Sequence, residues 1–106
     1  MIVTTMNDIP GYMVDEVFGE VMGLTVRSRH LGSQIGAGLK SIVGGELKGM
    51  TKALTASREQ VMARMVEEAE AKGANAIIAM RFDASELGKG WTEICAYGTA
   101  VKVHKA

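Results

Sequence analysis

The sequence predicts an α+β fold, a small two-layer sandwich in which a mainly antiparallel sheet packs against helices. Segments rich in valine, isoleucine and aromatic residues lie towards both ends of the chain, with patterns typical of strands. The middle of the chain instead repeats apolar residues with the period of a helix. At 106 residues the chain has room for one hydrophobic core. We therefore expect a single domain over residues 1–106.

Two strands are expected before the first helix. The short β-branched segment 2–5 predicts a strand, and residues 7–11, NDIPG, favour a turn after it. The segment from Tyr12 to Val26 predicts a long strand because its apolar residues alternate. Gly19 and Gly23 indicate bulges or a bend in this strand. The apolar residues expected on one face of it are Tyr12, Val14, Phe18, Met22, Leu24 and Val26.

Two helices are expected in the middle of the chain. Residues 31–45, LGSQIGAGLKSIVGG, are interpreted as a helix in which Gly32 and Gly36 let another backbone approach closely. A second helix is predicted from Leu47 to Lys72, and Gly73 is expected to end it in a left-handed conformation. The stripe expected to face the core consists of Leu47, Met50, Leu54, Val61, Met65 and Ala69, widened by Met62 and Val66.

Two further strands are expected after the helices. The continuous apolar run from Ala76 to Met80 indicates a strand that is covered on both faces. Residues 85–90, SELGKG, are typical of a loop, and the segment from Trp91 to His104 predicts a last long strand. The predicted order is strand, strand, helix, helix, strand, strand.

The predicted sheet carries more apolar surface than one subunit can bury. Helices cover one face of a four-stranded sheet, yet two of its strands are apolar on both faces. The surplus surface needs a partner. A homo-oligomer is therefore the expected state of the protein.

Net charge and cysteine content exclude several classes of function. Twelve basic and twelve acidic residues leave no net charge to attract a nucleic acid or an anionic membrane. No apolar run reaches the roughly twenty residues of a membrane-spanning helix, and the N-terminal residues lack the pattern of a signal peptide. Cys95 is the only cysteine, so an intrachain disulfide and a four-cysteine zinc site are excluded. We expect a cytoplasmic protein.

Several segments together resemble a known family. VRSRHLGSQIGAGLKSIVGGELKGM, SREQVMARMVEEAEAKGANAII, RFDAS and EICAYGTAVKV occur in that order, and IVGGEL, GANAII and AYGTAV are specific in combination. This combination resembles the YbjQ-like family of small bacterial and archaeal proteins over residues 2–103. The resemblance implies a subunit similar to the dodecin type, five copies of which close into a ring, and a label of heavy-metal binding. It implies no reaction, no substrate and no set of ligand residues.

The candidate ligands for a metal ion are few. Cys95, His30 and His104 are the only thiol and imidazole groups, and they show no CxxC or HxxxH spacing. Cys95 and His104 would lie roughly 30 Å apart on one strand, at about 3.3 Å per residue. A heavy-metal site would therefore combine Cys95 with His30, or several Cys95 thiols, from different subunits. The alternative for Cys95 is a buried packing residue, and the eight methionines are expected to pack rather than to bind copper(I).

The run GSQIGAGLKS looks like a phosphate-binding loop but lacks its spacing. That loop needs a glycine directly before its lysine, whereas Leu39 precedes Lys40 here. A different anion site could lie at the start of the helix expected over residues 31–45, where N–H groups without helical partners attract negative charge. Arg27 and Arg29 are the candidate anion-binding residues of that site.

Catalysis has no recognisable motif in this chain. The serines lack a GxSxG context, and neither histidine has a partner evident in the sequence. The leading hypothesis is a noncatalytic homo-oligomeric module that binds a metal ion or a small anionic ligand at subunit contacts. The alternative is an enzyme whose active site forms only between subunits, with Glu46, Arg27 and His30 as its candidate residues.

Overall fold

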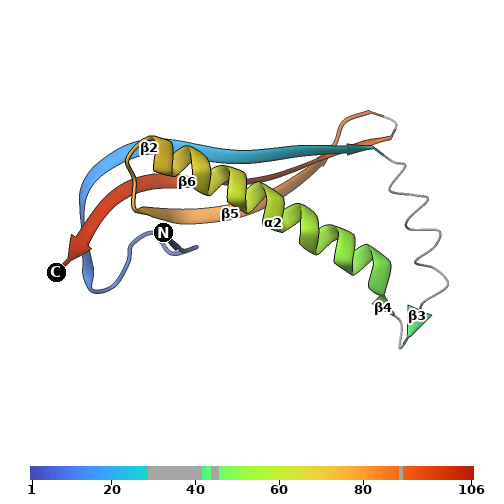
Figure 1. Ribbon diagram of the computed structural model, residues 1–106, viewed down its shortest axis with the longest axis horizontal. Coiled ribbons are helices and arrows are strands. Elements are labelled where there is room, and N and C mark those ends of the chain that lie inside the picture. Colours follow the sequence, from blue (N-terminus) through green and yellow to red (C-terminus); the bar gives the residue numbers. More distant parts are fainter. Residues whose placement is uncertain (29–41, 44–45, 89) are drawn as a thin grey trace.

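The computed structural model describes residues 1–28, 42–43, 46–88 and 90–106. In these residues one long helix lies across one face of a four-stranded sheet, which confirms the predicted α+β class (Figure 1). The strand order is β1-β5-β6-β2, and the sheet is mixed because β1 pairs parallel with β5 while the other pairs are antiparallel. These elements are β1 (Ile2–Val3), β2 (Tyr12–Ser28), α2 (Lys48–Ala71), β5 (Ala76–Glu86) and β6 (Trp91–Lys105).

The segment expected to be the first helix differs from that expectation where it is described. Ile42 and Val43 form a short strand, β3 (Ile42–Val43), which pairs antiparallel with β4 (Glu46–Leu47). Both residues are β-branched, and such residues favour an extended backbone. Residues 29–41 and 44–45 lie outside the described residues, so Gly32 and Gly36 and the rest of the expected helix lie there too.

The end of α2 follows the sequence prediction closely. Gly73 has a φ of 89°, in the left-handed region. Its N–H donates to the Glu70 carbonyl oxygen (3.0 Å), and the Ala74 N–H donates to the Ala69 carbonyl oxygen (3.1 Å). These two hydrogen bonds form a Schellman motif, in which glycine satisfies the last helical carbonyls without steric cost. The predicted role of Gly73 is confirmed, and the chain turns back here to enter β5.

The hydrophobic core lies between the C-terminal half of α2 and the sheet. Val61, Met65 and Ala69 are 0% exposed, which confirms this half of the predicted stripe. Leu54 is 50% exposed, so the expectation that it faces the core is wrong. Figure 1 shows the reason: α2 crosses the strands at an angle, and its N-terminal half diverges from them.

β2 does not keep one face apolar along its whole length. Its pairing with β6 shifts between Val14 and Glu16 and again between Val17 and Gly19. Gly19 has a φ of 94°, which confirms that it marks a bulge. Because a shift of one residue exchanges the two faces of a strand, the second shift cancels the first, and Val14 (paired with Val103) and Leu24 (paired with Cys95) point to the same side of the sheet. Phe18, at the second shift, departs from the expected face and packs against the core beneath α2.

Beyond the bulges, β2 presents alternate residues to α2 and to the opposite side of the sheet. The residues buried beneath α2 are Val21, Gly23 and Thr25. Met22, Leu24 and Val26 lie between them in sequence and are 40%, 41% and 48% exposed. These three side chains share one face of β2, as predicted, and that face is turned away from α2.

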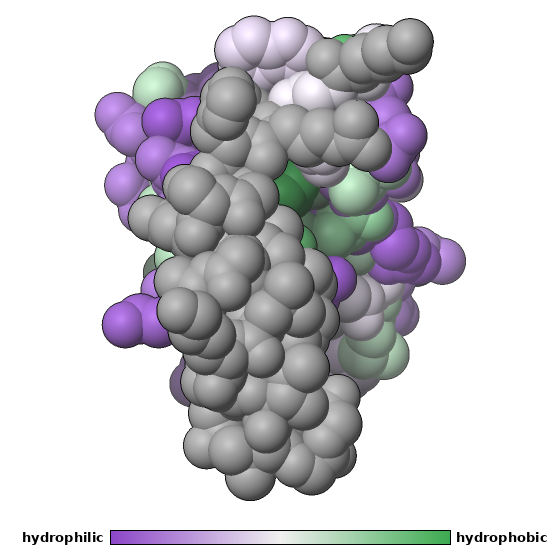
Figure 2. All heavy atoms as spheres, turned by 90° about the vertical axis from the view of Figure 1, so that its right-hand side faces the viewer, coloured by the Kyte–Doolittle hydropathy of each residue, from purple (hydrophilic) through white to green (hydrophobic). Residues whose placement is uncertain are grey.

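The sheet face opposite α2 is hydrophobic near this end of β2. Leu24 pairs with Cys95 of β6, and Met22 pairs with Tyr97. We call the surface formed by Met22, Leu24, Val26, Cys95 and Tyr97 the open face. Figure 2 views the molecule from the right-hand end of Figure 1 and shows that hydrophobic residues (green) also reach the surface at this end, beside hydrophilic ones (purple).

The outer edge of β2 is covered by side chains of α2. β2 lies at the edge of the sheet, and no strand of the described residues pairs with its outer edge. Residues four apart in a helix are separated by about 6 Å along its axis, and residues two apart in a strand by about 6.8 Å. Because these spacings are similar, side chains from successive helical turns can each reach a backbone group of the strand. The three hydrogen bonds are Arg64 Nη1 to the Leu24 oxygen (2.6 Å), the Met22 N–H to Glu68 Oε2 (3.1 Å) and Lys72 Nζ to the Glu20 oxygen (3.2 Å). This row of side chains blocks strand addition along this part of β2.

β5 is covered on both faces at its start, as its apolar run predicts. Ile77 belongs to the core beneath α2, whereas Ala76 belongs to a second buried cluster with Val101 and Val103. β5 continues to Glu86, so the expectation of a loop from residue 85 is wrong at Ser85 and Glu86. These two residues pair with Glu93 and Thr92 of β6.

Candidate functional site

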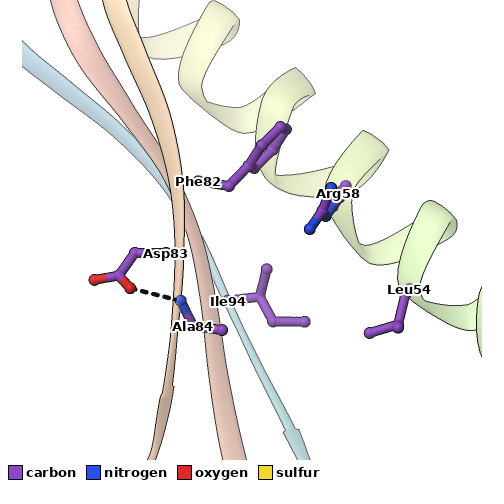
Figure 3. Close-up of a pocket in the computed structure, with 6 residues that line it drawn as sticks. All are labelled: Leu54, Arg58, Phe82, Asp83, Ala84 and Ile94. Atoms are coloured by element: carbon purple, nitrogen blue, oxygen red, sulfur yellow. Dashed lines mark hydrogen bonds between the residues drawn. The ribbon is translucent and has the colours of Figure 1, made fainter.

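A groove opens between the N-terminal half of α2 and the strands β5 and β6 (Figure 3). It has a volume of about 210 Å³. The groove exists because α2 diverges from the sheet and leaves Leu54 half exposed above Ile94 and its neighbours. The lining residues are Leu54 and Arg58 from α2, Phe82, Asp83 and Ala84 from β5, and Ile94 from β6.

Arg58 provides positive charge in this groove. Its guanidinium carbon lies 5.1 Å from the centre of the Phe82 ring, a cation–π contact that orients the arginine towards the sheet. Phe82 is 38% exposed, so the aromatic ring and the arginine are both open to solvent. A guanidinium held in this way presents N–H donors suited to a carboxylate or a phosphate.

Asp83 carries the carboxylate of the groove lining, and it does not face Arg58. Successive residues of a strand point to opposite faces, so Phe82 points to α2 while Asp83 points away from it (Figure 3). Asp83 Oδ1 accepts a hydrogen bond from the Ala84 N–H (2.9 Å). The groove therefore combines one cationic group with mostly apolar walls.

Arg27, a predicted anion-binding residue, lies at the end of β2 and beside α2. Its Nη2 donates to Gln60 Oε1 (2.8 Å), while its Nε is buried and has no hydrogen-bond partner in the described part of the chain. The second predicted residue, Arg29, lies outside the described residues, as does His30. Of the residues predicted for an enzyme between subunits, Arg27 is thus engaged with α2, and Glu46 lies in β4.

Cys95 lies on the open face and is 7% exposed. Its burial raises the pKa of the thiol, and the negative charges of Asp83 and Glu93 raise it further. A backbone hydrogen bond from Asp83 acts in the opposite direction. The thiol is therefore protonated at neutral pH, and the acidic neighbours that disfavour the thiolate would attract a cation.

We predict that Cys95 reacts slowly in the native protein. With the disulfide reagent DTNB at pH 8, the rate should be at least about tenfold below that of the urea-unfolded chain, because the native thiolate is scarce and shielded. Because the pKa of the Cys95 thiol is higher in the folded than in the unfolded chain, its ionisation destabilises the fold. The free energy of unfolding should therefore be highest below the ordinary cysteine pKa and fall as the pH rises through the raised pKa. Equal rates in native and unfolded protein would contradict both the burial and the raised pKa.

The predicted metal ligands do not come together within one subunit. No group of three or more histidine, cysteine, aspartate or glutamate residues with metal-binding geometry occurs in residues 1–28, 42–43, 46–88 and 90–106. His104 lies near the end of β6, where its Nδ1 is 2.7 Å from Asp15 Oδ1 and half of its side chain is exposed. The described residues of one subunit therefore do not fit a resident heavy-metal ion.

Sequence reasoning missed the Arg58–Phe82 pair. The two residues are far apart in the chain, and arginine on an exposed helix position is ordinary. The one available signal was the spacing of Leu54 and Arg58, which places both on the same side of a helix. That spacing does not reveal that β5 carries an aromatic ring opposite them.

The fold and the groove define a class of protein: a small α+β domain with one helix laid across a mixed sheet and a cationic groove beside it. None of the described helical segments is long and apolar enough to cross a membrane. A family model described as "Putative heavy-metal-binding" matches residues 1–104. The chain belongs to this family, the YbjQ-like family, which confirms the resemblance drawn from its motifs.

Similar proteins from several bacteria carry the name UPF0145 protein. One from Acidothermus cellulolyticus is 66% identical over 105 residues, which cover 99% of this chain and 97% of the relative. One from Streptomyces coelicolor is 65% identical over 103 residues, 97% of either chain. One from Lactococcus lactis subsp. cremoris is 52% identical over 105 residues, 99% of this chain and 96% of the relative. These names state no reaction.

A solved structure has the same fold. It is the crystal structure of a Pediococcus pentosaceus protein, described as having unknown function and belonging to the DUF74 family. The TM-score is 0.62 at 12% identity, and the match covers 98% of each chain. At this identity the likeness shows the fold alone.

Proposed function

We propose that this chain is a noncatalytic, cytoplasmic homo-oligomeric module whose dodecin-like subunits close into a ring of five. The observation that carries the proposal is the open face. Met22, Leu24 and Val26 are each at least 40% exposed in one subunit, next to Tyr97 and Cys95. A contiguous apolar surface of this kind is typical of a contact between proteins.

The two sides of the molecule indicate where a second copy fits. Between Glu20 and Leu24 the outer edge of β2 is closed to strand pairing by side chains of α2. The open face has no such cover from α2, which lies on the opposite side of the sheet. We therefore assign the contact to the open face of the sheet. The number five comes from the family resemblance, and the balanced charge of the chain is why no nucleic acid or membrane partner is included.

The ligand of this proposal is a heavy-metal ion held between copies. Cys95 lies within the open face, so a contact through this face would bring Cys95 of one copy close to a second copy. Asp83 and Glu93 already place negative charge beside the thiol. Thiolate and carboxylate groups from two or more subunits could then supply the ligands that one subunit lacks. A small anion bound by Arg27 and Arg29 is the competing ligand, because the buried Nε of Arg27 has no hydrogen-bond partner among the described residues.

Native mass spectrometry of untagged protein tests the assembly and the ligand together. We expect a species of five times the 11.3 kDa subunit mass, with extra mass that a chelator removes. Leu24→Glu should convert it to monomer, because a charge buried in an apolar contact is costly. Lys102→Glu, an exposed change on β6 outside the open face, is the matched control and should keep the ring.

The outcomes separate the parts of the proposal. Monomeric wild-type protein, or a ring that Leu24→Glu leaves intact, would contradict the assigned contact. A ring that gains no mass with Zn²⁺ or Cd²⁺, or gains it equally in Cys95→Ala, would contradict the metal site. Extra mass that survives the chelator and is lost in Arg27→Gln would favour the anion instead.

A further inference from the structure

We propose that the groove between α2 and the β5–β6 pair binds a small organic anion, a carboxylate or phosphate attached to an apolar body. This site belongs to one subunit and involves neither Cys95 nor Arg27. It goes beyond the proposed assembly and does not depend on it.

The anionic part of the ligand is set by Arg58. Its guanidinium stacks over Phe82 at 5.1 Å, and such stacking leaves the N–H groups at the rim of the guanidinium plane for hydrogen bonding. The ion pairs between described residues join Lys72 to Glu68 and His104 to Asp15, so no described carboxylate neutralises Arg58. An arginine oriented by an aromatic ring loses less conformational freedom when it binds an anion.

Asp83 does not supply the missing negative charge. Its side chain points away from Arg58 and accepts a hydrogen bond from the Ala84 N–H, as Figure 3 shows. Its charge instead acts on Cys95, on the side of the sheet away from α2. The arginine side of the groove therefore keeps its positive character.

The apolar part of the ligand is set by the walls. Leu54, Phe82, Ala84 and Ile94 contribute hydrophobic surface around Arg58. The volume of about 210 Å³ lies below the roughly 300 Å³ at which pockets for drug-sized ligands begin. A ring or short hydrocarbon chain with one acidic group fits this combination of size, wall chemistry and charge.

Benzoate is the probe for this site because it combines a ring with one carboxylate. Titration of the assembled wild-type protein, followed by amide NMR shifts or calorimetry, should give a dissociation constant on the order of 1 mM or tighter. Arg58→Gln should weaken binding roughly 10- to 100-fold, because a charged hydrogen-bond donor is lost. Lys52→Gln removes one charge from another exposed position of α2 and should leave benzoate binding unchanged.

Two further probes separate the parts of the ligand. Acetate keeps the charge without the ring, and benzyl alcohol keeps the ring without the charge, so each should bind at least tenfold more weakly than benzoate. Phe82→Leu keeps an apolar wall but removes the stacking partner of Arg58, and it should weaken benzoate without changing subunit number.

Several results would overturn the proposal. Binding that is absent at 10 mM benzoate, on the order of ten times the expected constant, would do so. Equal weakening by Arg58→Gln and Lys52→Gln would show a nonspecific charge effect. If Arg58→Gln abolished the ring in native mass spectrometry while wild-type protein ignored benzoate, the groove would be a subunit contact instead.

Discussion

Replacing Gly23 with alanine is expected to destabilise the protein by about 3 kcal/mol or more, because the new methyl group has no space. A Cβ at this position would overlap the Val61 carbonyl oxygen and lie 2.7 Å from the Met65 backbone nitrogen. Both are helix backbone atoms, so no side chain can rotate to make room. The helix would have to lift from β2, which would weaken the core and the edge hydrogen bonds together. Urea denaturation followed by circular dichroism measures the loss.

Gly11→Ala is the control for this prediction. Gly11 has a φ of 85°, and a Cβ there would meet nothing within 4 Å. Its replacement should cost only the roughly 1–2 kcal/mol of a left-handed alanine. If Gly23→Ala were no more harmful than Gly11→Ala, the close packing of α2 on β2 would be contradicted.

Met65→Ala is expected to cost about 2–5 kcal/mol, the usual range for truncating a large side chain in a core. Met65 is 0% exposed and is among the largest fully buried side chains. It lies between the helix and the sheet in the main core cluster, where a cavity would be lined by well-packed neighbours. The urea concentration at the midpoint of unfolding should fall, while the contacts between the groove residues remain in the folded protein.

Leu54→Ala is the matched comparison on the same helix. Because Leu54 is 50% exposed, its truncation should cost less than about 1 kcal/mol in a single subunit. A loss as large as that of Met65→Ala would show that Leu54 is buried in the assembled protein, at the groove or at a contact. Comparing the stability of the two variants therefore shows which part of α2 packs on the sheet and which part diverges from it.

Local sequence signals predicted the elements well wherever the deciding interaction is local. The end of α2 at Gly73 depends on backbone conformation within one turn, and glycine meets it better than any other residue. The strand from Ala76 and the bulge at Gly19 likewise follow from short patterns. The segment before α2 was predicted as a helix, but its glycine and apolar residues are compatible with several structures. Its described residues Ile42 and Val43 form a strand.

The candidate site could not be predicted to the same extent. Cys95 was identified as one of few metal-capable residues. Its neighbour Glu93 lies two residues earlier on the same strand, but Asp83 approaches it only through the pairing of β5 with β6. Arg58 and Phe82 were not identified, because their contact depends on the angle at which α2 crosses the sheet. Composition and spacing contain no information about that angle.

The sequence by itself determined the α+β class, the limits of α2 to within one residue, the long strands β2 and β6, the family and the absence of known catalytic motifs. Each of these depends on residue type and on spacing along the chain. Only the tertiary structure decided which side of β2 is buried, because α2 packs on the side that carries Val21, Gly23 and Thr25, where the missing side chain of Gly23 lets the helix backbone come close. It also decided that Leu54 lines a groove instead of the core. The physical reason is that packing depends on register and crossing angle, which arise from contacts between distant segments.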